Sequence, residues 1–516
     1  MNNTFYYLLD DKNNKLYFII KSFVVGICSS IVVILYRLAL LYAEKISFNV
    51  YNFVNNNKIC IPFLFIFLGI IGFIVGKIIE IEPNCSGSGI PQIKAILGGN
   101  ISNNPISVIL NKFIGGLLSI LSGLSLGREG PSIQLGGCTG DYLSKKFKSS
   151  PLERKLLISS GASAGLSAAF NAPLSGVLFS LEELYRYFSP IVLISTMISS
   201  VVSDYISKEV FGLNPIFNFK ESPSLPLKYY WIIILLGIIC GISGIIYNKS
   251  IKLIQQIYSK INIHNKFKMP ILFVLSGIIC LICPTIICGG HILLNKLTLS
   301  TNILLILVLV IAKFIFSIIS FGSKAPGGIF FPLLILGCGI GSIFGSICIK
   351  YLGISPIYYD TFLILAMAGY FTAIVQAPIT SVVLITEMTA SLQFLLPLTL
   401  ITIISYLISD YFNNPPIYTT LLENILKNNN KENDVSTSKD TILITNIVHY
   451  GSKIEGKAIK ELILPDNIII ITILRNNNYI TPKGNTIIKA GDEILTLSNI
   501  STEAYNRSLL DELTSV

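Results

Sequence analysis

The sequence predicts an all-α polytopic membrane protein that carries a small α+β domain at its C-terminus. Hydrophobic residues occupy 52% of the 516 positions and charged residues only 13%, and the mean hydropathy is +0.69. Such values are typical of chains that cross a bilayer several times. The apolar runs long enough to span or re-enter a bilayer lie at about 17–42, 61–80, 191–202, 229–247, 270–288, 303–320, 329–349, 362–386 and 393–409.

Glycine and proline interrupt several of these runs. At membrane depth an interrupted helix is tolerated only where the freed backbone groups lie inside protein or line a water-filled cavity. We therefore expect the apolar part of the chain, residues 1–426, to form a transmembrane domain with discontinuous helices around an internal site.

The C-terminal part of the chain changes character after the last apolar run. Residues 427–440, KNNNKENDVSTSKD, are polar and aperiodic, which predicts a linker. Residues 441–516 alternate β-rich stretches with turn residues, which predicts a small α+β domain. We expect strands at about 442–448, 467–474 and 493–498 and short helices at about 456–462 and 502–513.

An acid and a base stand between two glycines in the segment Gly127–Pro131, GREGP, which follows an apolar stretch. A charge at membrane depth is costly unless it lines a cavity or meets a partner, so Glu129 is a candidate functional residue. Glycine and proline together indicate a helix start, whose unpaired N–H groups attract anions. A carboxylate there would occupy the place of an anion, and its protonation would vacate that place. The alternative is a buried Arg128–Glu129 ion pair with a structural role only.

Two further glycine-rich turns precede prolines. In the turn Gly87–Pro91, GSGIP, the Ser88 hydroxyl would add a donor to the free N–H groups. The alternative is an ordinary serine that caps a helix. The turn Gly327–Pro332, GGIFFP, has no charged side chain, so its backbone N–H groups would have to hold an anion.

The chain contains a diverged internal repeat. Lys112-Phe113-Ile114 recurs as Lys313-Phe314-Ile315, and the stretch 164–183 resembles the stretch 368–387. In membrane proteins such repeats place a substrate site between the halves, near the middle of the bilayer. The sequence does not distinguish a parallel repeat from an inverted one.

Three more side chains supply chemistry that the turns lack. Glu182 and Glu183 end the apolar helix of the first repeat, and at least one of two adjacent acids should face protein or a water path. Either acid is a candidate for a second carboxylate in a proton relay. Tyr418 would present a phenolic donor to an anion, and a tyrosine at the membrane interface is the alternative interpretation.

The sequence does not indicate an enzyme, a metal site or a nucleic-acid-binding protein. We find no nucleophile–base pair, metal quartet or phosphate loop. Cys280, Cys283 and Cys288 lie in an apolar run without histidine or acid partners, so we expect no metal or other cofactor. The net charge of +10 is scattered along the chain. A membrane enzyme or receptor that uses residues 441–516 as a sensor is the alternative from another class.

The motifs together resemble the CLC family of chloride channels and proton-coupled chloride transporters over roughly residues 17–426. GSGIP, GREGP, AAFNAPLSG, GGIFFP and the late Tyr418 occur in the family's order and approximate spacing. The resemblance implies a CLC-type inverted repeat with discontinuous helices. It also implies a homodimer with one ion pathway per subunit.

The resemblance assigns roles to individual residues. Those expected to bind chloride are Ser88, Ile329, Phe330 and Tyr418, and those expected to act in gating and proton transfer are Glu129, Glu183 and Glu182. The helix N-termini of the anion site would be formed by Gly87, Gly89, Pro91, Gly127, Arg128, Gly130, Pro131, Gly327, Gly328 and Pro332.

Two comparisons within the family refine the expected transport. Channel members typically lack an acid at the position of Glu183, so the resemblance favours an antiporter, and Ser88 is similar to the serine of chloride-type members. One departure concerns Gln92 and Lys94, which stand where transporter relatives often carry acids. We therefore expect the electrostatics around Lys112 to differ from those of these relatives.

The C-terminal domain resembles the TrkA-C module, which forms the C-terminal half of RCK regulatory domains in potassium transport. The recurring elements are Gly456-Lys457, Leu464-Pro465, Pro482-Lys483-Gly484 and Ala490-Gly491-Asp492. The resemblance implies a cytosolic domain that dimerises and sometimes binds a small ligand such as a cyclic dinucleotide. A dimer-stabilising appendage without a ligand is the alternative.

We therefore expect a proton-coupled chloride antiporter that is gated by protonation of Glu129. Its partners would be chloride, protons and a second copy of the chain, with a possible nucleotide ligand at residues 441–516 and no nucleic acid. We expect it in the cytoplasmic membrane of a bacterium, with the C-terminal domain in the cytosol. The alternative is a passive voltage- or pH-gated chloride channel of the same family.

Overall fold

The computed structural model describes residues 12–514 apart from 186–189, 218, 220–222, 262, 430–440, 463, 466–467, 476–477 and 500–502. The chain forms two compact units. The larger comprises Met1–Ile93 and Asn104–Leu421, and the smaller comprises Lys94–Asn103 and Leu422–Val516. Helix α18 extends to Asn429 and so includes the first residues of the expected linker, whereas 430–440 lie outside the described residues.

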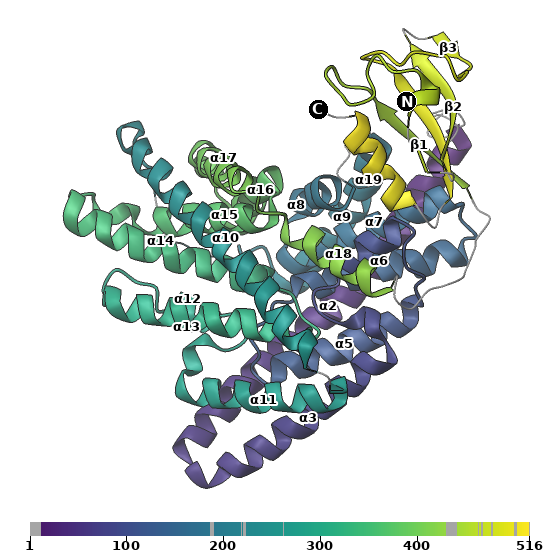
Figure 1. Ribbon diagram of the computed structural model, residues 1–516. Coiled ribbons are helices and arrows are strands. Elements are labelled where there is room, and N and C mark those ends of the chain that lie inside the picture. Colours follow the sequence, from purple (N-terminus) through teal and green to yellow (C-terminus); the bar gives the residue numbers. More distant parts are fainter. Residues whose placement is uncertain are drawn as a thin grey trace. The chain divides into compact units, whose positions relative to one another are not determined.

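Helices make up the larger unit (Figure 1). The first half of the chain forms α2 (Lys12–Asn56), α3 (Ile61–Ile81), α4 (Ile90–Leu97), α5 (Pro105–Leu121), α6 (Glu129–Lys146), α7 (Pro151–Phe170), α8 (Pro173–Phe179), the π-helical segment η3 (Ser180–Tyr185) and α9 (Pro190–Phe211). The second half forms α10 (Tyr230–Lys260), α11 (Asn265–Ile282), α12 (His291–Leu294), α13 (Ile303–Gly322), α14 (Phe330–Leu352), α15 (Tyr359–Val375), α16 (Pro378–Thr389), α17 (Leu395–Tyr411) and α18 (Ile417–Asn429).

The predicted fold class is confirmed. Nine of the described helices are long and apolar enough to cross a membrane, and several others are short and broken as the interrupted runs predict. The run 362–386 is one of these interrupted runs. It divides into α15 and α16 at Gln376, which has a φ of +60°, and at Pro378, which cannot continue the hydrogen-bonding of the preceding helix.

Equivalent lysines in the two repeats make equivalent contacts. Lys112 Nζ donates to the carbonyl oxygens of Cys85 (3.0 Å) and Gly87 (2.6 Å). Lys313 Nζ donates in the same way to Ile286 (2.9 Å) and Cys288 (2.7 Å), at the same sequence separations. Each buried ammonium thus finds hydrogen-bond acceptors among backbone carbonyl groups near a broken helix.

The two repeats also bind each other reciprocally. Gly87 N–H donates to Lys324 O over 2.9 Å, and Cys288 N–H donates to Gly123 O over 3.1 Å. Cys288 and Lys324 are the counterparts of Gly87 and Gly123 in the second repeat, because both are numbered 201 higher. Exchange of equivalent contacts is what a two-fold relation between the halves produces, and the expected inverted repeat requires such a relation.

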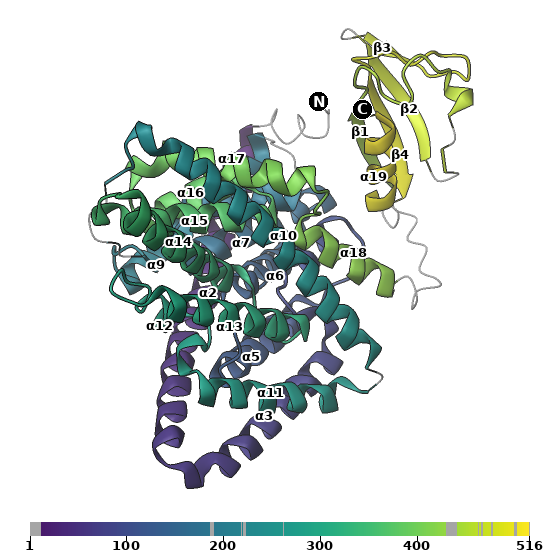
Figure 2. The same cartoon turned by 60° about the vertical axis from the view of Figure 1, so that its left-hand side comes forward.

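Glycines let two helix pairs approach closely, one pair in each repeat. A Cβ atom on Gly136 of α6 would overlap the backbone oxygen of Gly161 of α7. A Cβ atom on Gly337 of α14 would lie 2.8 Å from the backbone oxygen of Ala366 of α15. Small residues allow helix backbones to pack in a membrane, where no hydrophobic force drives helices together. Figures 1 and 2 show a third pair, α3 and α11, side by side.

The smaller unit contains a four-stranded antiparallel sheet in the order β1–β4–β2–β3 (Figure 2). Its strands are β1 (Thr441–Ile447), β2 (Ile468–Arg475), β3 (Asn478–Ile480) and β4 (Glu493–Asn499), and α19 (Glu503–Thr514) packs against β1 and β4. The helix expected at 456–462 is wrong, because only Ile459–Glu461 form a single 3₁₀ turn. Arg475 binds Asp492 through two bonds of 2.7 and 2.6 Å, and these bonds raise the pKa of the guanidinium above its ordinary value.

Candidate functional site

All three glycine-rich turns lie directly before helix starts. Helix α4 begins at Ile90, α6 at Glu129 and α14 at Phe330. Proline lies within the first turn of each helix, where its missing N–H costs no hydrogen bond. The turn chemistry therefore predicted the helix starts, and each start directs unpaired N–H groups outward.

Backbone hydrogen bonds join the three turns. Gly127 and Gly328 exchange both of their backbone bonds, Gly127 N–H to Gly328 O over 2.6 Å and Gly328 N–H to Gly127 O over 2.8 Å. Gly327 N–H donates to Gly87 O over 3.0 Å. The structure thus brings the ends of α4, α6 and α14 to one junction between the repeats, although the turns are far apart in the sequence.

Ser88 lies inside this junction. It is only 3% exposed, and its Oγ has no hydrogen-bond partner among the described residues. The flanking glycines, Gly87 and Gly89, have φ angles of +61° and +97°, a conformation that other residues adopt at a cost. A Cβ atom on Gly130 would overlap the Ser88 hydroxyl, so the second turn must be glycine for the serine to fit. A buried hydroxyl without a partner indicates a place for a ligand.

The Glu129 carboxylate lies against the N-terminus of α14. Its side chain is fully buried, and Oε2 accepts a hydrogen bond from Phe331 N–H over 3.3 Å. The first intrahelical bond of α14 runs from Leu333 N–H to Ile329 O, so the Phe331 N–H is one of the groups that the helix itself leaves unpaired. The carboxylate therefore occupies a position that suits an anion.

The alternative role for Glu129, a structural ion pair, has little geometric support. Arg128 Nε lies 3.9 Å from Glu129 Oε1, at the outer limit of an ion pair. Neither of these two atoms has a hydrogen-bond partner among the described residues. A strong buried pair would be hydrogen-bonded, and usually bidentate.

Tyr418 is connected to the third turn by a series of aromatic contacts. It is fully buried, and its hydroxyl has no hydrogen-bond partner among the described residues. Its ring packs edge-on against Phe179, 6.5 Å between centroids, and Phe179 packs against Phe330 at the same distance. Phe330 also contacts Phe371 at 4.4 Å. Ile329 and Phe330, the expected amide donors, form the start of α14 beside these rings.

The two adjacent acids have different surroundings. Glu183 is buried, with 2% of its side chain exposed, in the π-helical segment η3 that continues α8. Glu182 binds the other repeat: its Oε1 accepts from Ile379 N–H (3.1 Å), and its Oε2 accepts from Thr380 N–H and the Thr380 hydroxyl (2.7 Å each). Glu182 therefore caps the N-terminus of α16.

Sequence reasoning missed three contributors to this site. Phe179 was a member of the repeated stretch but gave no signal of its own, because an aromatic residue in a membrane helix is ordinary. Glu387 is the repeat counterpart of Glu182, and their equal spacing from Pro378 and Pro173 was a usable signal. Gln92 donates to Ser86 O over 2.8 Å and so supports the first turn, a contact that its position alone does not reveal.

The cysteines do not gather into a metal site. Among the described residues no group of three or more His, Cys, Asp or Glu side chains is placed to hold a metal ion. Cys280 and Cys288 instead donate weakly to the carbonyl oxygens of Gly123 and Ile120, at 3.6 and 3.4 Å. They behave as small buried hydrophobic residues with a weak donor.

Comparison with known proteins identifies both parts of the chain. Residues 67–410 match the family described as voltage gated chloride channel, and residues 446–504 match the TrkA-C domain. The chain is 34% identical over 355 residues to the H(+)/Cl(-) exchange transporter ClcA of Vibrio parahaemolyticus, covering 67% of this chain and 76% of that protein. It is 36% identical over 356 residues to the protein of the same name from Yersinia pestis, covering 67% and 74%.

Solved structures agree with this assignment. The chain is similar to a slow cyanobacterial Cl−/H+ antiporter, with a TM-score of 0.76 and 26% identity, over 80% of this chain and 99% of that one. A eukaryotic CLC transporter shares the fold at a TM-score of 0.67 and 18% identity, over 80% of this chain and 74% of that one. The chain therefore belongs to the voltage-gated chloride channel (CLC) family, and it carries a TrkA-C domain after its membrane-spanning helices.

Proposed function

We propose that this protein exchanges chloride for protons across a bacterial cytoplasmic membrane, with Glu129 as the gate. The observation that carries the proposal is the contact between Glu129 Oε2 and Phe331 N–H at the start of α14. A negative carboxylate and a chloride ion would compete for this N–H group. Protonation removes the charge of the carboxylate and its advantage at the helix end, so chloride then takes the position.

Chloride would be held below this gate by groups that the fold leaves available. The hydroxyls of Ser88 and Tyr418 are buried and without protein partners among the described residues, and hydroxyl donors suit a partly dehydrated anion. The amides of Ile329 and Phe330 lie at the start of α14, where the helix dipole favours negative charge. A site built from neutral donors binds chloride without trapping it.

The second carboxylate supports exchange over passive conduction. Glu183 is a buried acid on η3, and an acid within the membrane is costly to maintain unless it takes part in transport. Relatives that are 34–36% identical are named H(+)/Cl(-) exchange transporters, which points the same way. In this proposal Glu183 passes protons between one side of the membrane and Glu129. A passive chloride channel with the same pore is the second candidate.

Simultaneous recording of chloride and pH in proteoliposomes tests the proposal. In the parent chain, a chloride gradient should drive protons against their own gradient, which a channel cannot do. Glu129→Gln should keep chloride flux and lose proton flux, because an amide does not carry a titrating proton. Glu209→Gln, at an exposed position of α9, is the matched control and should behave as the parent. Proton pumping that persists in Glu129→Gln would refute the role of Glu129.

We also propose a division of labour along the chain. Residues 1–426 would transport ions, 427–440 would link, and 441–516 would regulate from the cytosol as a homodimeric TrkA-C domain. The match of residues 446–504 to the TrkA-C domain supports this assignment. A cyclic dinucleotide is the proposed class of ligand, to be tested by calorimetric titration of the full-length protein. Absence of binding, with transport unchanged when 441–516 are deleted, would leave only a structural role.

A further inference from the structure

Two carboxylates exchange equivalent contacts across the repeat interface. Glu182 binds the start of α16 through the three bonds described above. Glu387 binds the start of α8 in the same way: Oε1 accepts from Leu174 N–H (2.9 Å), and Oε2 accepts from Ser175 N–H (2.8 Å) and the Ser175 hydroxyl (2.5 Å). Each acid lies nine residues after the proline that opens its own helix, so the pairing is symmetric.

This exchange fixes both ends of one short segment. Helix α8 and η3 run without interruption from Pro173 to Tyr185 and lie against α16. Glu387, in the last turn of α16, binds the first turn of the segment. Glu182, near the end of the segment, binds the first turn of α16. Glu183, the adjacent residue, lies on the part of the segment that Glu182 restrains.

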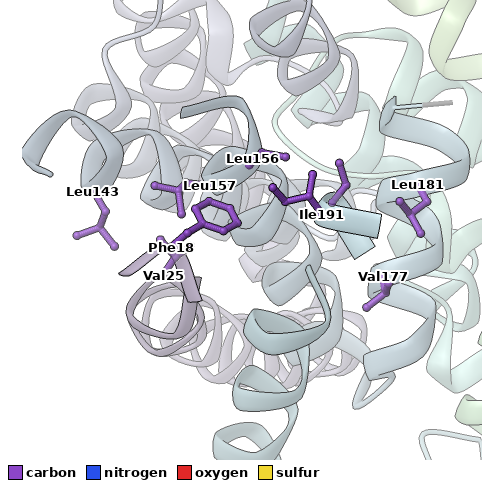
Figure 3. Close-up of a cluster of buried hydrophobic side chains, with 9 residues drawn as sticks. Phe18, Val25, Leu143, Leu156, Leu157, Val177, Leu181 and Ile191 are labelled. Atoms are coloured by element: carbon purple, nitrogen blue, oxygen red, sulfur yellow. The ribbon is translucent and has the colours of Figure 1, made fainter. Parts of the chain in front are cut away.

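A hydrophobic cluster holds the middle of the same segment. Val177 of α8 and Leu181 of η3 belong to a buried group with residues of α2, α6, α7 and α9 (Figure 3). Packing in this cluster limits movement of the segment relative to α2, α6, α7 and α9. The bonds of the two carboxylates limit its movement along the axis of α16. A π-helical segment such as η3 is less regular than an α-helix and benefits from such restraint.

The hydrogen bonds of Glu182 also make it unsuited to carry a transported proton. Both of its oxygens accept bonds from backbone N–H groups at a helix N-terminus. Adding a proton would weaken these bonds and release the start of α16. Glu129, the proposed carrier, accepts one bond of 3.3 Å from Phe331 N–H, whereas Glu182 accepts three bonds of 2.7–3.1 Å. Protonation of Glu182 in every transport cycle would therefore disrupt a complete helix cap each time.

We infer that Glu182 and Glu387 form a reciprocal clamp that positions Glu183, and that neither carries the transported proton. This inference rests on the proposed role of Glu183 in proton transfer. Glu387 is then a positioning residue, although it lies in the other repeat and far along the chain from Glu183. The two members of the clamp should respond alike to equivalent substitutions.

The test is the number of protons moved per chloride in proteoliposomes of the full-length protein. Displacement of a reacting group by about 1 Å can cost a hundredfold in rate, so Glu387→Ala and Glu182→Ala should each lower this ratio by about tenfold while chloride flux persists. The glutamine variants keep one acceptor oxygen and should retain part of the coupling. Glu183→Gln gives the fully uncoupled reference, and Glu209→Ala, at an exposed site, should keep the parental ratio.

Three results would overturn the inference. A purely structural role would reduce both fluxes equally in Glu387→Ala and leave the ratio unchanged. If Glu182→Gln abolished proton movement while Glu387→Gln coupled normally, Glu182 would be the carrier and no clamp would be needed. If the alanine variants fail to fold, Ser175→Ala and Thr380→Ala remove one bond from each cap, and equal, parental ratios in both would contradict the positioning role.

Thermal melting separates this inference from the proposed function. A parent chain that moves chloride without protons would overturn the proposed exchange and the role of Glu183. The clamp itself is still tested by its melting temperatures, because two caps on one helix pair should couple. The double variant Glu182→Ala/Glu387→Ala should then lose less than the sum of the single losses, and strict additivity would contradict a clamp.

Discussion

At the scale of single residues, the site contains buried polar groups whose burial costs free energy, and the surrounding fold offsets part of that cost. Glu129 is completely buried, yet it meets the N-terminus of α14, where a negative charge is favoured. The Ser88 hydroxyl is buried and has no hydrogen-bond partner in the described part of the chain, an arrangement that normally costs stability unless a ligand satisfies the donor. Both features support the proposed competition between a carboxylate and an anion at this site.

Removal of the Ser88 hydroxyl should weaken chloride binding. A hydrogen bond to a charged group contributes about 1.5–3 kcal/mol, so Ser88→Ala should raise the chloride Kd by roughly tenfold or more. Calorimetric titration of the purified protein with chloride measures this change. Ser119→Ala is the matched control, because the Ser119 hydroxyl donates to Gly115 O within its own helix. Equal affinities in Ser88→Ala and the parent would exclude Ser88 as a chloride ligand.

Most of these residues were predictable because their chemistry conflicts with their surroundings. An acid in apolar sequence at Glu129 and glycines before prolines are visible without a structure. The different surroundings of Glu182 and Glu183 were not, because adjacent residues point in different directions around a helix and only the packed structure shows what each one meets. Proton transfer by Glu183 remains a prediction.

At the scale of helices, small residues determine how closely the elements pack. Helix α7 contains the sequence GASAGLSAAF and is not among the apolar runs, but all of its residues from Leu156 to Phe170 are buried. Hydropathy underestimates such a helix because glycine, serine and alanine are only weakly apolar. The run 362–386 divides into α15 and α16 at Gln376 and Pro378, although the residues on both sides are apolar.

An added methyl group should separate α6 from α7. A Cβ atom on Gly161 would overlap the backbone oxygen of Gly136, and backbone cannot move aside as a flexible side chain can. Gly161→Ala should therefore destabilise the protein by at least about 1–3 kcal/mol and lower its melting temperature in detergent. Gly69→Ala is the control, because no atom lies within 4 Å of the added position, and it should change stability by less than about 0.5 kcal/mol. Similar melting temperatures for both variants would contradict the close packing.

At the scale of the whole membrane unit, the two repeats share their packing contacts but differ in the side chains that they place at the site. The contacts of Lys112 and Lys313, and those of Glu182 and Glu387, repeat almost atom for atom. The acid of the Gly127–Pro131 turn has no counterpart, because Phe330 occupies the equivalent position in the second repeat. One half therefore supplies the carboxylate, and the other supplies the helix end that the carboxylate meets.

The repeat was visible in the sequence, but the relative orientation of its two copies was not. Matching segments such as Lys112–Ile114 and Lys313–Ile315 reveal that two copies exist. Reciprocal contacts, such as those of Gly87 with Lys324 and of Cys288 with Gly123, relate the copies by a two-fold operation. Such contacts depend on how the chain folds back on itself, which local sequence patterns do not record.

The competition between the Glu129 carboxylate and a halide is tested most directly by anomalous diffraction from crystals soaked in bromide. In the Glu129→Gln variant, we predict bromide within hydrogen-bonding distance of Phe331 N–H, at the position of the parental carboxylate. In the parent at a pH that keeps Glu129 charged, the carboxylate should remain and exclude bromide from that position. Bromide beside an unmoved carboxylate in the parent, or no bromide there in Glu129→Gln, would contradict the account.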